Sequence, residues 1–313
     1  MVRRLLLASP RGYCAGVERA VETVERALEA HGPPVYVRRQ IVHNAHVLSR
    51  LEALGAVFVE DEADVPEGAL LVLSAHGVAP VVHERAARRG LRTIDATCPL
   101  VAKVHAEARR YVAAGYTLIL IGHAGHDEVE GTLGEAPEAI LVQTVADAER
   151  VDVPDPQQLA YVTQTTLSVD ETAEIVATLE RRFPTIEGPA ASDICYATTN
   201  RQRAVKELAA EVDLVLVIGS ENSSNSNRLV ETAGAAGADA YLIEDETAID
   251  EQWLEGREVV GLTAGASAPE ELVRRVCDWF RARGVEDIRS AGAVVEDVFF
   301  RLPAELRRTV PAA

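Results

Sequence analysis

Residues 91–105, Leu-Arg-Thr-Ile-Asp-Ala-Thr-Cys-Pro-Leu-Val-Ala-Lys-Val-His, predict a strand that passes into a helix at Cys98. The part before the cysteine is short and extended in character, and the part after it places apolar residues at helical spacing. Pro99 suits the first turn of a helix, where a missing N–H costs nothing. Cys98 is therefore expected at a helix N-terminus, where the helix dipole favours the metal-binding thiolate.

Two further cysteines stand in the same setting. Cys14 follows the extended segment LLLASPRGY and Cys195 follows ASDI, and each precedes an amphipathic stretch of about 15 residues. The fourth cysteine, Cys277, lies inside the expected helix ELVRRVCDWFRARG on the apolar stripe with Val273, and core packing explains it. Three of the four cysteines are thus candidates for one shared site.

The similarity extends beyond the cysteines. Each amphipathic stretch is followed by an apolar strand and a polar loop, then by a helix and a strand, and then by a further strand with a second polar loop. The pattern indicates an internal triplication of strand–helix units, which implies mainly parallel sheets. The first strands are residues 35–37, 117–121 and 214–218, and the further strands open the segments 70–80, 159–170 and 259–270.

We therefore predict three similar α/β domains in a pseudo-threefold arrangement around a central cleft. Loops that follow parallel strands share one edge of the sheet, so six polar loops and three thiols are expected to converge there. The first two repeats end on the strand that leads to the next cysteine, whereas the third shows none after Trp279, and residues 4–9 are expected to supply it. The predicted domains are residues 14–98, 99–195, and 196–284 with 1–13, followed by a C-terminal tail, 285–313.

The composition argues against several other classes of protein. The 313 residues carry a formal net charge of −18 without a run of Lys or Arg, which argues against nucleic-acid binding. The N-terminal apolar stretch is too short for a signal-peptide core or a membrane span, so a cytoplasmic protein is expected. No cysteine lies in a C-x-x-C pair, which leaves zinc-ribbon and thioredoxin readings without local support. Only Lys103 and Lys206 are lysines, and we attribute this to coding bias.

The polar loops form a set of neutral hydrogen-bond donors. Hydroxyls, amides and imidazoles, together with the N–H groups at helix starts, make a phosphate site without fixed charge. Any one Ser, Thr or Asn before a helix is ordinarily an N-cap, but repetition at equivalent positions favours ligand binding. The candidates are His43, His76, His126, Thr165, Ser223, Ser224, Asn225 and Ser267.

One carboxylate and the three cysteines are the remaining candidates for chemistry. Glu128, two positions after His126 at an expected helix start, is either placed for the helix dipole or carries a proton to a leaving group. Three cysteines fit a structural zinc only if a histidine joins them. They also fit a [4Fe–4S] cluster with one iron open to substrate, and the residues alone leave both possibilities open.

Together these residues resemble the 4-hydroxy-3-methylbut-2-enyl diphosphate reductase family. The motifs occur in the family's order from Ser9 to about Pro269, and in combination they are highly specific. They are RGYCAGV (11–17), IVHN (41–44), SAHG (74–77), DATCP (95–99), Gly122 with His126 and Glu128, TQTT (163–166), DICYATTNRQ (193–202), NSSNS (222–226) and TAGAS (263–267).

The resemblance implies the last step of the non-mevalonate isoprenoid pathway. Two electrons and two protons remove the C4 hydroxyl as water and yield isopentenyl and dimethylallyl diphosphates. By the resemblance, a [4Fe–4S] cluster is held by Cys14, Cys98 and Cys195, Glu128 donates the proton, and Thr165 positions the hydroxyl end. It further implies an electron-donor protein such as ferredoxin or flavodoxin. The diphosphate-binding residues that it implies are His43, His76, Ser223, Ser224, Asn225 and Ser267, with His126 beside them.

Three positions depart from the family pattern. Tyr13 stands where Phe is frequent, Gln40 where an acid is common, and Asp127 where Pro often separates the histidine from the glutamate. Asp127 is expected to help raise the pKa of Glu128 as a neighbouring negative charge. The alternatives from other classes are a non-catalytic metal or redox sensor on the same scaffold and a zinc-dependent hydrolase of a phosphorylated substrate.

Overall fold

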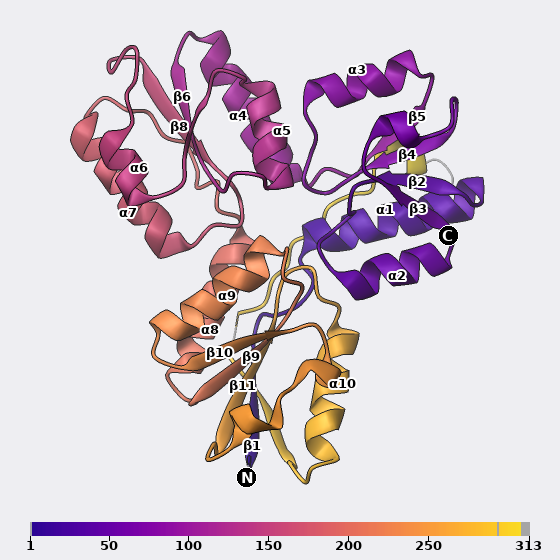
Figure 1. Cartoon of the computed structure of the whole chain (residues 1–313), viewed down its shortest axis with the longest axis vertical. Coiled ribbons are helices and arrows are strands. Elements are labelled where there is room, and N and C mark those ends of the chain that lie inside the picture. Colours follow the sequence, from indigo (N-terminus) through magenta and orange to yellow (C-terminus); the bar gives the residue numbers. More distant parts are fainter. Residues whose placement is uncertain (1, 293, 308–313) are drawn as a thin grey trace. The chain divides into compact units, whose positions relative to one another are not determined.

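The computed structural model describes residues 2–292 and 294–307, and in them the strands form three separate sheets whose pairs are all parallel (Figure 1). The predicted α/β fold with three small parallel sheets is confirmed. Several strands are buried along their whole length, for example β9 (Leu214–Ile218) and β4 (Leu70–Leu73). Strands covered on both faces read as continuous apolar runs, which is how the sequence presents them.

The first sheet has the strand order β3-β2-β4-β5, and the second has the order β7-β6-β8. The elements of the first repeat are α1 (Ala15–His31), β2 (Val35–Arg38), α2 (Ala45–Ala53), β3 (Ala56–Val59), β4, α3 (Pro80–Arg88) and β5 (Arg92–Asp95). Those of the second are α4 (Pro99–Ala113), β6 (Thr117–Ile121), α5 (Asp127–Glu135), β7 (Ile140–Val142), α6 (Val145–Arg150), β8 (Leu159–Thr163) and α7 (Val169–Arg182).

The third sheet has the order β10-β9-β11-β1-β12 and therefore includes the N-terminal strand. Strand β1 lies between β11 and β12, so the expectation that residues 4–9 complete the third sheet is confirmed. The elements are β1 (Arg4–Ala8), α8 (Tyr196–Ala209), β9, α9 (Ser224–Ala235), β10 (Asp239–Ile243), β11 (Val259–Ala264), α10 (Glu270–Arg281) and β12 (Asp287–Ala291).

Alternate residues of β1 face opposite layers of helices. Leu5 and Leu7 pack in one core with residues of α10, and Leu6 and Ala8 pack in another with residues of α8 and α9. This is the period of two that a strand between helical layers requires. Cys277 of α10 is buried in the first of these cores, and burial raises the pKa of its thiol. Its expected role in packing is confirmed.

By its contacts the chain divides into two compact units. One, which we call the one-sheet unit, holds the third sheet and consists of Met1–Ala15, His43–Val47 and Tyr196–Phe299. The other, the two-sheet unit, holds the first and second sheets and consists of Gly16–Val42, Leu48–Cys195 and Phe300–Ala313. None of the helices in the described part of the chain combines the length and the apolar character needed to cross a membrane.

Two sequence-based expectations need correction. Residues 285–313 do not form only a tail, and the third repeat does have a strand after Trp279, because β12 pairs with β1 at the edge of the sheet. Its sequence, Asp-Ile-Arg-Ser-Ala, is too polar to read as a core strand, and the edge position tolerates this. The extended segment expected at 191–194 before Cys195 is a loop without strand pairing, whereas the element before Cys14 is strand β1 and the element before Cys98 is strand β5.

Candidate active site

All three candidate cysteines stand at the start of a helix. Cys14 precedes α1, Cys195 precedes α8, and Cys98 is the N-cap of α4 with Pro99 in the first turn. All three are free thiols and partly exposed, unlike the buried Cys277. The expected placement of each cysteine at a helix start is therefore confirmed.

One backbone contact recurs at the three cysteines. The N–H of Cys14 donates to the carbonyl of Ala266 (3.3 Å), that of Cys98 to Ala75 (2.9 Å), and that of Cys195 to Thr165 (3.1 Å). Each acceptor lies in the second polar loop of a repeat, which also carries a candidate donor. These donors are Ser267, His76 and Thr165 itself. The triplication therefore extends to the peptide groups that hold the thiols.

Glu128, in the first turn of α5, is a buried acid with its carboxylate fully engaged. The side chain is 2% exposed, and its two oxygens accept the Thr165 N–H (2.6 Å) and the Thr165 hydroxyl (3.0 Å). Burial raises the pKa of Glu128 to about 7; the hydrogen bonds from Thr165 oppose the rise, and the negative charge of Asp193 adds to it. A carboxyl group with this pKa is matched to proton transfer near neutral pH.

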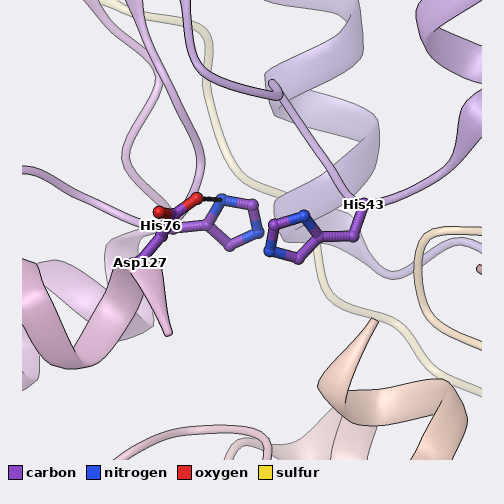
Figure 2. A group of neighbouring side chains, drawn as sticks. All are labelled: His43, His76 and Asp127. Atoms are coloured by element: carbon purple, nitrogen blue, oxygen red, sulfur yellow. Dashed lines mark ion pairs between the residues drawn. The ribbon is translucent and has the colours of Figure 1, made fainter. Parts of the chain in front are cut away.

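Asp127 does not act on Glu128 as the sequence suggested. Consecutive helix residues point in different directions, and the Asp127 carboxylate pairs with Arg39 instead. Its other oxygen lies 3.8 Å from Nδ1 of His76, and Figure 2 shows this carboxylate directed at the His76 ring. The negative charge that helps raise the pKa of Glu128 comes from Asp193, whose role sequence reasoning missed.

His126 is the N-cap of α5, and this fixes how its ring is used. Nδ1 accepts the Glu128 N–H at 3.1 Å, so the neutral ring carries its proton on Nε2. The ring lies edge to face with His76, with centroids 5.9 Å apart. One nitrogen of His126 thus serves the helix, while the other is a donor suited to an anion.

In the one-sheet unit, Ser223 and Ser267 form a hydroxyl cluster at the start of α9. Ser223 is the N-cap, and its oxygen accepts the Ser226 N–H (3.3 Å) and hydroxyl (2.9 Å). The Ser267 hydroxyl lies 3.5 Å from that of Ser223 and donates to the His43 carbonyl at 2.8 Å. For Ser223 the capping interpretation is therefore correct, and because Ser267 gives its proton to His43, Ser223 is the donor in the contact between the two hydroxyls.

The sequence did not single out Ser226, yet it fixes the shape of this loop. A β-carbon added at Gly219 or at Gly265 would lie 2.1 Å from the Ser226 hydroxyl oxygen. Only glycine permits both backbones to approach this side chain. The signal in the sequence was a glycine directly after the strand in both polar loops of the third repeat.

Asn225 carries a buried donor that no described group accepts. Its side chain is 4% exposed, and Oδ1 accepts the Ala266 N–H at 2.8 Å. Within residues 2–292 and 294–307, Nδ2 has no hydrogen-bond partner. An unsatisfied buried NH₂ group is costly, and a bound anion would satisfy it. Ser224, in the first turn of the same helix, is half-buried, and His43 Nδ1 lies 3.3 Å from Asn222 Nδ2.

Glu128 and Asn225 occupy equivalent positions in two repeats. Each is the second residue of its helix, and each accepts a peptide N–H, from Thr165 and Ala266 respectively. The carbonyl of Thr165 in turn accepts the N–H of Cys195, and that of Ala266 accepts the N–H of Cys14. The same scaffold thus presents a carboxyl group in one repeat and an amide in another.

The raised pKa of Glu128 links the stability of the protein to pH. Between pH 4.5 and about 7 the folded protein binds one more proton than the unfolded chain, so this contribution is present below pH 4.5 and lost as the pH rises to about 7. In the wild-type protein this should lower the free energy of unfolding by roughly 3 kcal/mol between low and high pH. Because glutamine cannot ionise, Glu128→Gln should not show this decrease. Urea unfolding of the metal-free protein at about pH 5 and about pH 8 measures it, with Glu149→Gln, an exposed carboxylate on α6, as the control. Equal pH dependence in the two variants would contradict the assignment.

Known proteins match nearly the whole chain. The family described as LytB protein matches residues 5–281. A protein of Acidothermus cellulolyticus named 4-hydroxy-3-methylbut-2-enyl diphosphate reductase is 60% identical over 99% of this chain and 92% of its own length. A protein of Neisseria gonorrhoeae with the same name is 56% identical over 98% of this chain and 96% of its own length.

Solved structures agree as well. The structure of E-1-hydroxy-2-methyl-but-2-enyl-4-diphosphate reductase from Plasmodium falciparum superposes with a TM-score of 0.95 at 40% identity and covers 98% of both chains. A second structure, of (E)-4-hydroxy-3-methyl-but-2-enyl diphosphate reductase, gives a TM-score of 0.64 at 32% identity and covers 90% of this chain and 100% of its own. This chain belongs to the LytB protein family.

Proposed function

We propose that this protein reduces 4-hydroxy-3-methylbut-2-enyl diphosphate to isopentenyl and dimethylallyl diphosphates at a [4Fe–4S] cluster held by Cys14, Cys98 and Cys195. The relatives carry the name of this reductase, and one is described as the terminal enzyme of the non-mevalonate pathway. The observation that carries the proposal is the linked series Glu128–Thr165–Cys195. Thr165 donates its N–H (2.6 Å) and its hydroxyl (3.0 Å) to the protonatable acid, and its carbonyl accepts the N–H of the candidate ligand Cys195 (3.1 Å).

The cysteines fit an iron–sulfur cluster. Each is a free, partly exposed thiol at a helix start, and each is held by the same peptide contact. Cys277 is buried in a separate core and is unsuited to be a fourth ligand. Three thiolates leave one iron without a protein ligand, and when bound the cluster would supply electrons and a Lewis-acidic iron for the substrate hydroxyl.

The one-sheet unit is suited to hold the diphosphate. Its donors are neutral, namely the hydroxyls of Ser223, Ser224 and Ser267, the amide of Asn225 and the ring of His43, and the N-terminus of α9 adds its N–H groups. The buried Nδ2 of Asn225 is the group that most needs an anion. From the two-sheet unit we assign diphosphate contacts to His76 and His126.

Glu128 supplies the proton that turns the leaving hydroxyl group into water. With a pKa of about 7 it is about half protonated at neutral pH, unlike an ordinary carboxyl group. The Thr165 hydroxyl, 3.0 Å from Glu128, can pass this proton on to the substrate oxygen. Overall, two electrons and two protons convert the allylic alcohol into an alkene and water, so the second proton ends on carbon.

The electrons come from another protein in this proposal, such as a ferredoxin or a flavodoxin, in the cytoplasm. The alternatives, a redox sensor and a zinc-dependent hydrolase, make different demands on the site. A sensor has no use for a buried acid with a pKa near 7, and a hydrolase has no use for electrons. Iron and sulfide analysis together with turnover separates all three.

Loss of one ligand should abolish the cluster. Cys14→Ser, Cys98→Ser and Cys195→Ser should each lose the oxygen-sensitive [4Fe–4S] centre, because a serine hydroxyl replaces the thiolate. Cys277→Ser is the control, since this residue lies in the core, and it should keep the cluster. Iron and sulfide are measured after anaerobic purification. An intact cluster in Cys98→Ser would refute the ligand set.

Removing the acid should slow turnover without affecting binding. Glu128→Gln can still accept the Thr165 N–H but cannot supply a proton, so turnover should fall by about 10²-fold or more. Thr165→Val should lose less, because water can partly replace the hydroxyl relay. Steady-state rates with a chemical reductant measure the effect, and Glu149→Gln serves as the control. A near-normal rate in Glu128→Gln would mean that another group supplies the proton, with the diphosphate of the substrate as the next suspect.

Asn225→Asp isolates the amide donor. A carboxylate can still accept the Ala266 N–H, but it replaces the buried NH₂ group with a negative charge that faces the anion. Binding of the substrate should weaken by roughly 2–3 kcal/mol or more, which calorimetry on the variant with intact cluster can measure. Asn227→Asp on the same helix is the matched control, because that amide donates to the Glu221 carbonyl near the surface. Equal affinities for the two variants would show that Asn225 serves only the fold.

A further inference from the structure

Three basic side chains have a relation to the cysteines that the proposed reaction does not use. Arg19 follows Cys14 by five residues on α1. Its guanidinium donates to the carbonyls of Ala96 (2.9 Å), Thr97 (3.0 Å) and Asp95 (3.4 Å), which are the three residues before Cys98. A cation from the helix of one cysteine therefore holds the turn that leads to the next.

Lys103 repeats this relation in the second repeat. It follows Cys98 by five residues on α4, and Nζ donates to the carbonyls of Ala191 (2.8 Å) and Ser192 (3.4 Å) and to Asp193 Oδ1 (2.9 Å). This segment leads to Cys195. The other oxygen of Asp193 accepts the Thr163 N–H at 2.9 Å, so the same contact reaches the end of β8.

Arg201 closes the series. It follows Cys195 by six residues on α8 and donates to the carbonyls of Gly12 (2.7 and 3.0 Å) and Tyr13 (3.0 Å), directly before Cys14. The side chain is completely buried, and Glu296 balances its charge at 3.0 Å. The helix after Cys14 thus contacts the turn before Cys98, and the helix after Cys98 contacts the turn before Cys195. The helix after Cys195 contacts the turn before Cys14, so the three contacts form a closed cycle.

We propose that Arg19, Lys103 and Arg201 are positioning residues for the three thiolates, each fixing the turn that presents the next cysteine. The inference rests on the proposed function for the identity of the bound group, but the contacts belong to the protein itself. The turn before each of the three helices has carbonyls without ladder partners, and one cation satisfies two or three of the acceptors there.

The segment beyond β12 supports two of the three cations. The Arg301 carbonyl accepts Nε of Arg19 at 2.8 Å, and the Glu296 carboxylate accepts from both Arg201 and Asn200. These contacts give residues 296–301 a function that their sequence did not suggest. Arg301 and Glu296 thus accept from N–H groups of Arg19 and Arg201 that do not bind the turns before the cysteines.

Amide hydrogen exchange of the metal-free protein tests the inference without the cluster. Lys103→Met should speed exchange of the Cys195 amide and its preceding turn by about tenfold or more and leave residues 95–98 unchanged. Arg19→Met should speed exchange in residues 95–98 and leave the Cys195 amide and its preceding turn unchanged. Lys206→Met, which removes the other lysine, should change neither segment, and Lys103→Arg, which keeps the charge, should restore part of the protection. Thermal unfolding identifies any variant that is destabilised as a whole.

The second measurement is the release of iron to a chelator after anaerobic reconstitution. Lys103→Met and Arg19→Met should release iron about tenfold faster or more than Lys206→Met does. Uniformly faster exchange, or local changes with unaltered iron release, would overturn the inference. If the local exchange pattern appears but the wild-type protein takes up no iron and sulfide, the positioning of the cysteines is supported and the proposed function fails.

Discussion

The site depends on one hydrogen bond that occurs three times, from the N–H of each candidate cysteine to the carbonyl of the second polar loop in a repeat. A helix start has N–H groups without partners inside the helix, and a loop after a parallel strand has carbonyls to accept them. The contact therefore satisfies two backbone groups and sets each thiol beside a loop with polar donors. Because the acceptor follows a buried strand, the packing of the sheet fixes the position of the sulfur.

The same scaffold gives different chemistry in different repeats. The Thr165 peptide donates to a carboxyl group and the Ala266 peptide to an amide, at the same position of the helix. In the first repeat the corresponding N–H, that of Ala75, donates to the Ile41 carbonyl instead. Burial keeps Glu128 protonatable near pH 7, whereas the amide of Asn225 stays a donor at every pH. The repeated frame thus places an ionisable carboxyl group in one repeat and a neutral amide at the equivalent position of another.

The sequence predicted what local patterns determine and missed what distant contacts determine. Apolar runs located β6 and β9 with their observed bounds, and the repeated strand–helix order located the cysteines. The polar strand β12 was missed because pairing with β1 stabilises it, not its own composition. The influence assigned to Asp127 was wrong because adjacency in sequence says little about direction on a helix. The charge that adds to the raised pKa of Glu128 belongs to Asp193, which is distant in sequence.

A chain of net charge −18 can still contain an anion site if the acidic side chains are kept away from it. The proposed ligands, a diphosphate and three thiolates, are themselves negative, so exposed carboxylates would repel them. The candidate donors are themselves neutral, and helix N-termini add favourable partial charge. Arg19, Lys103 and Arg201 donate to backbone carbonyls, and Arg201 is fully buried. The positive charge of Arg201 is therefore fixed inside the fold, where in our proposal it holds the turn before Cys14.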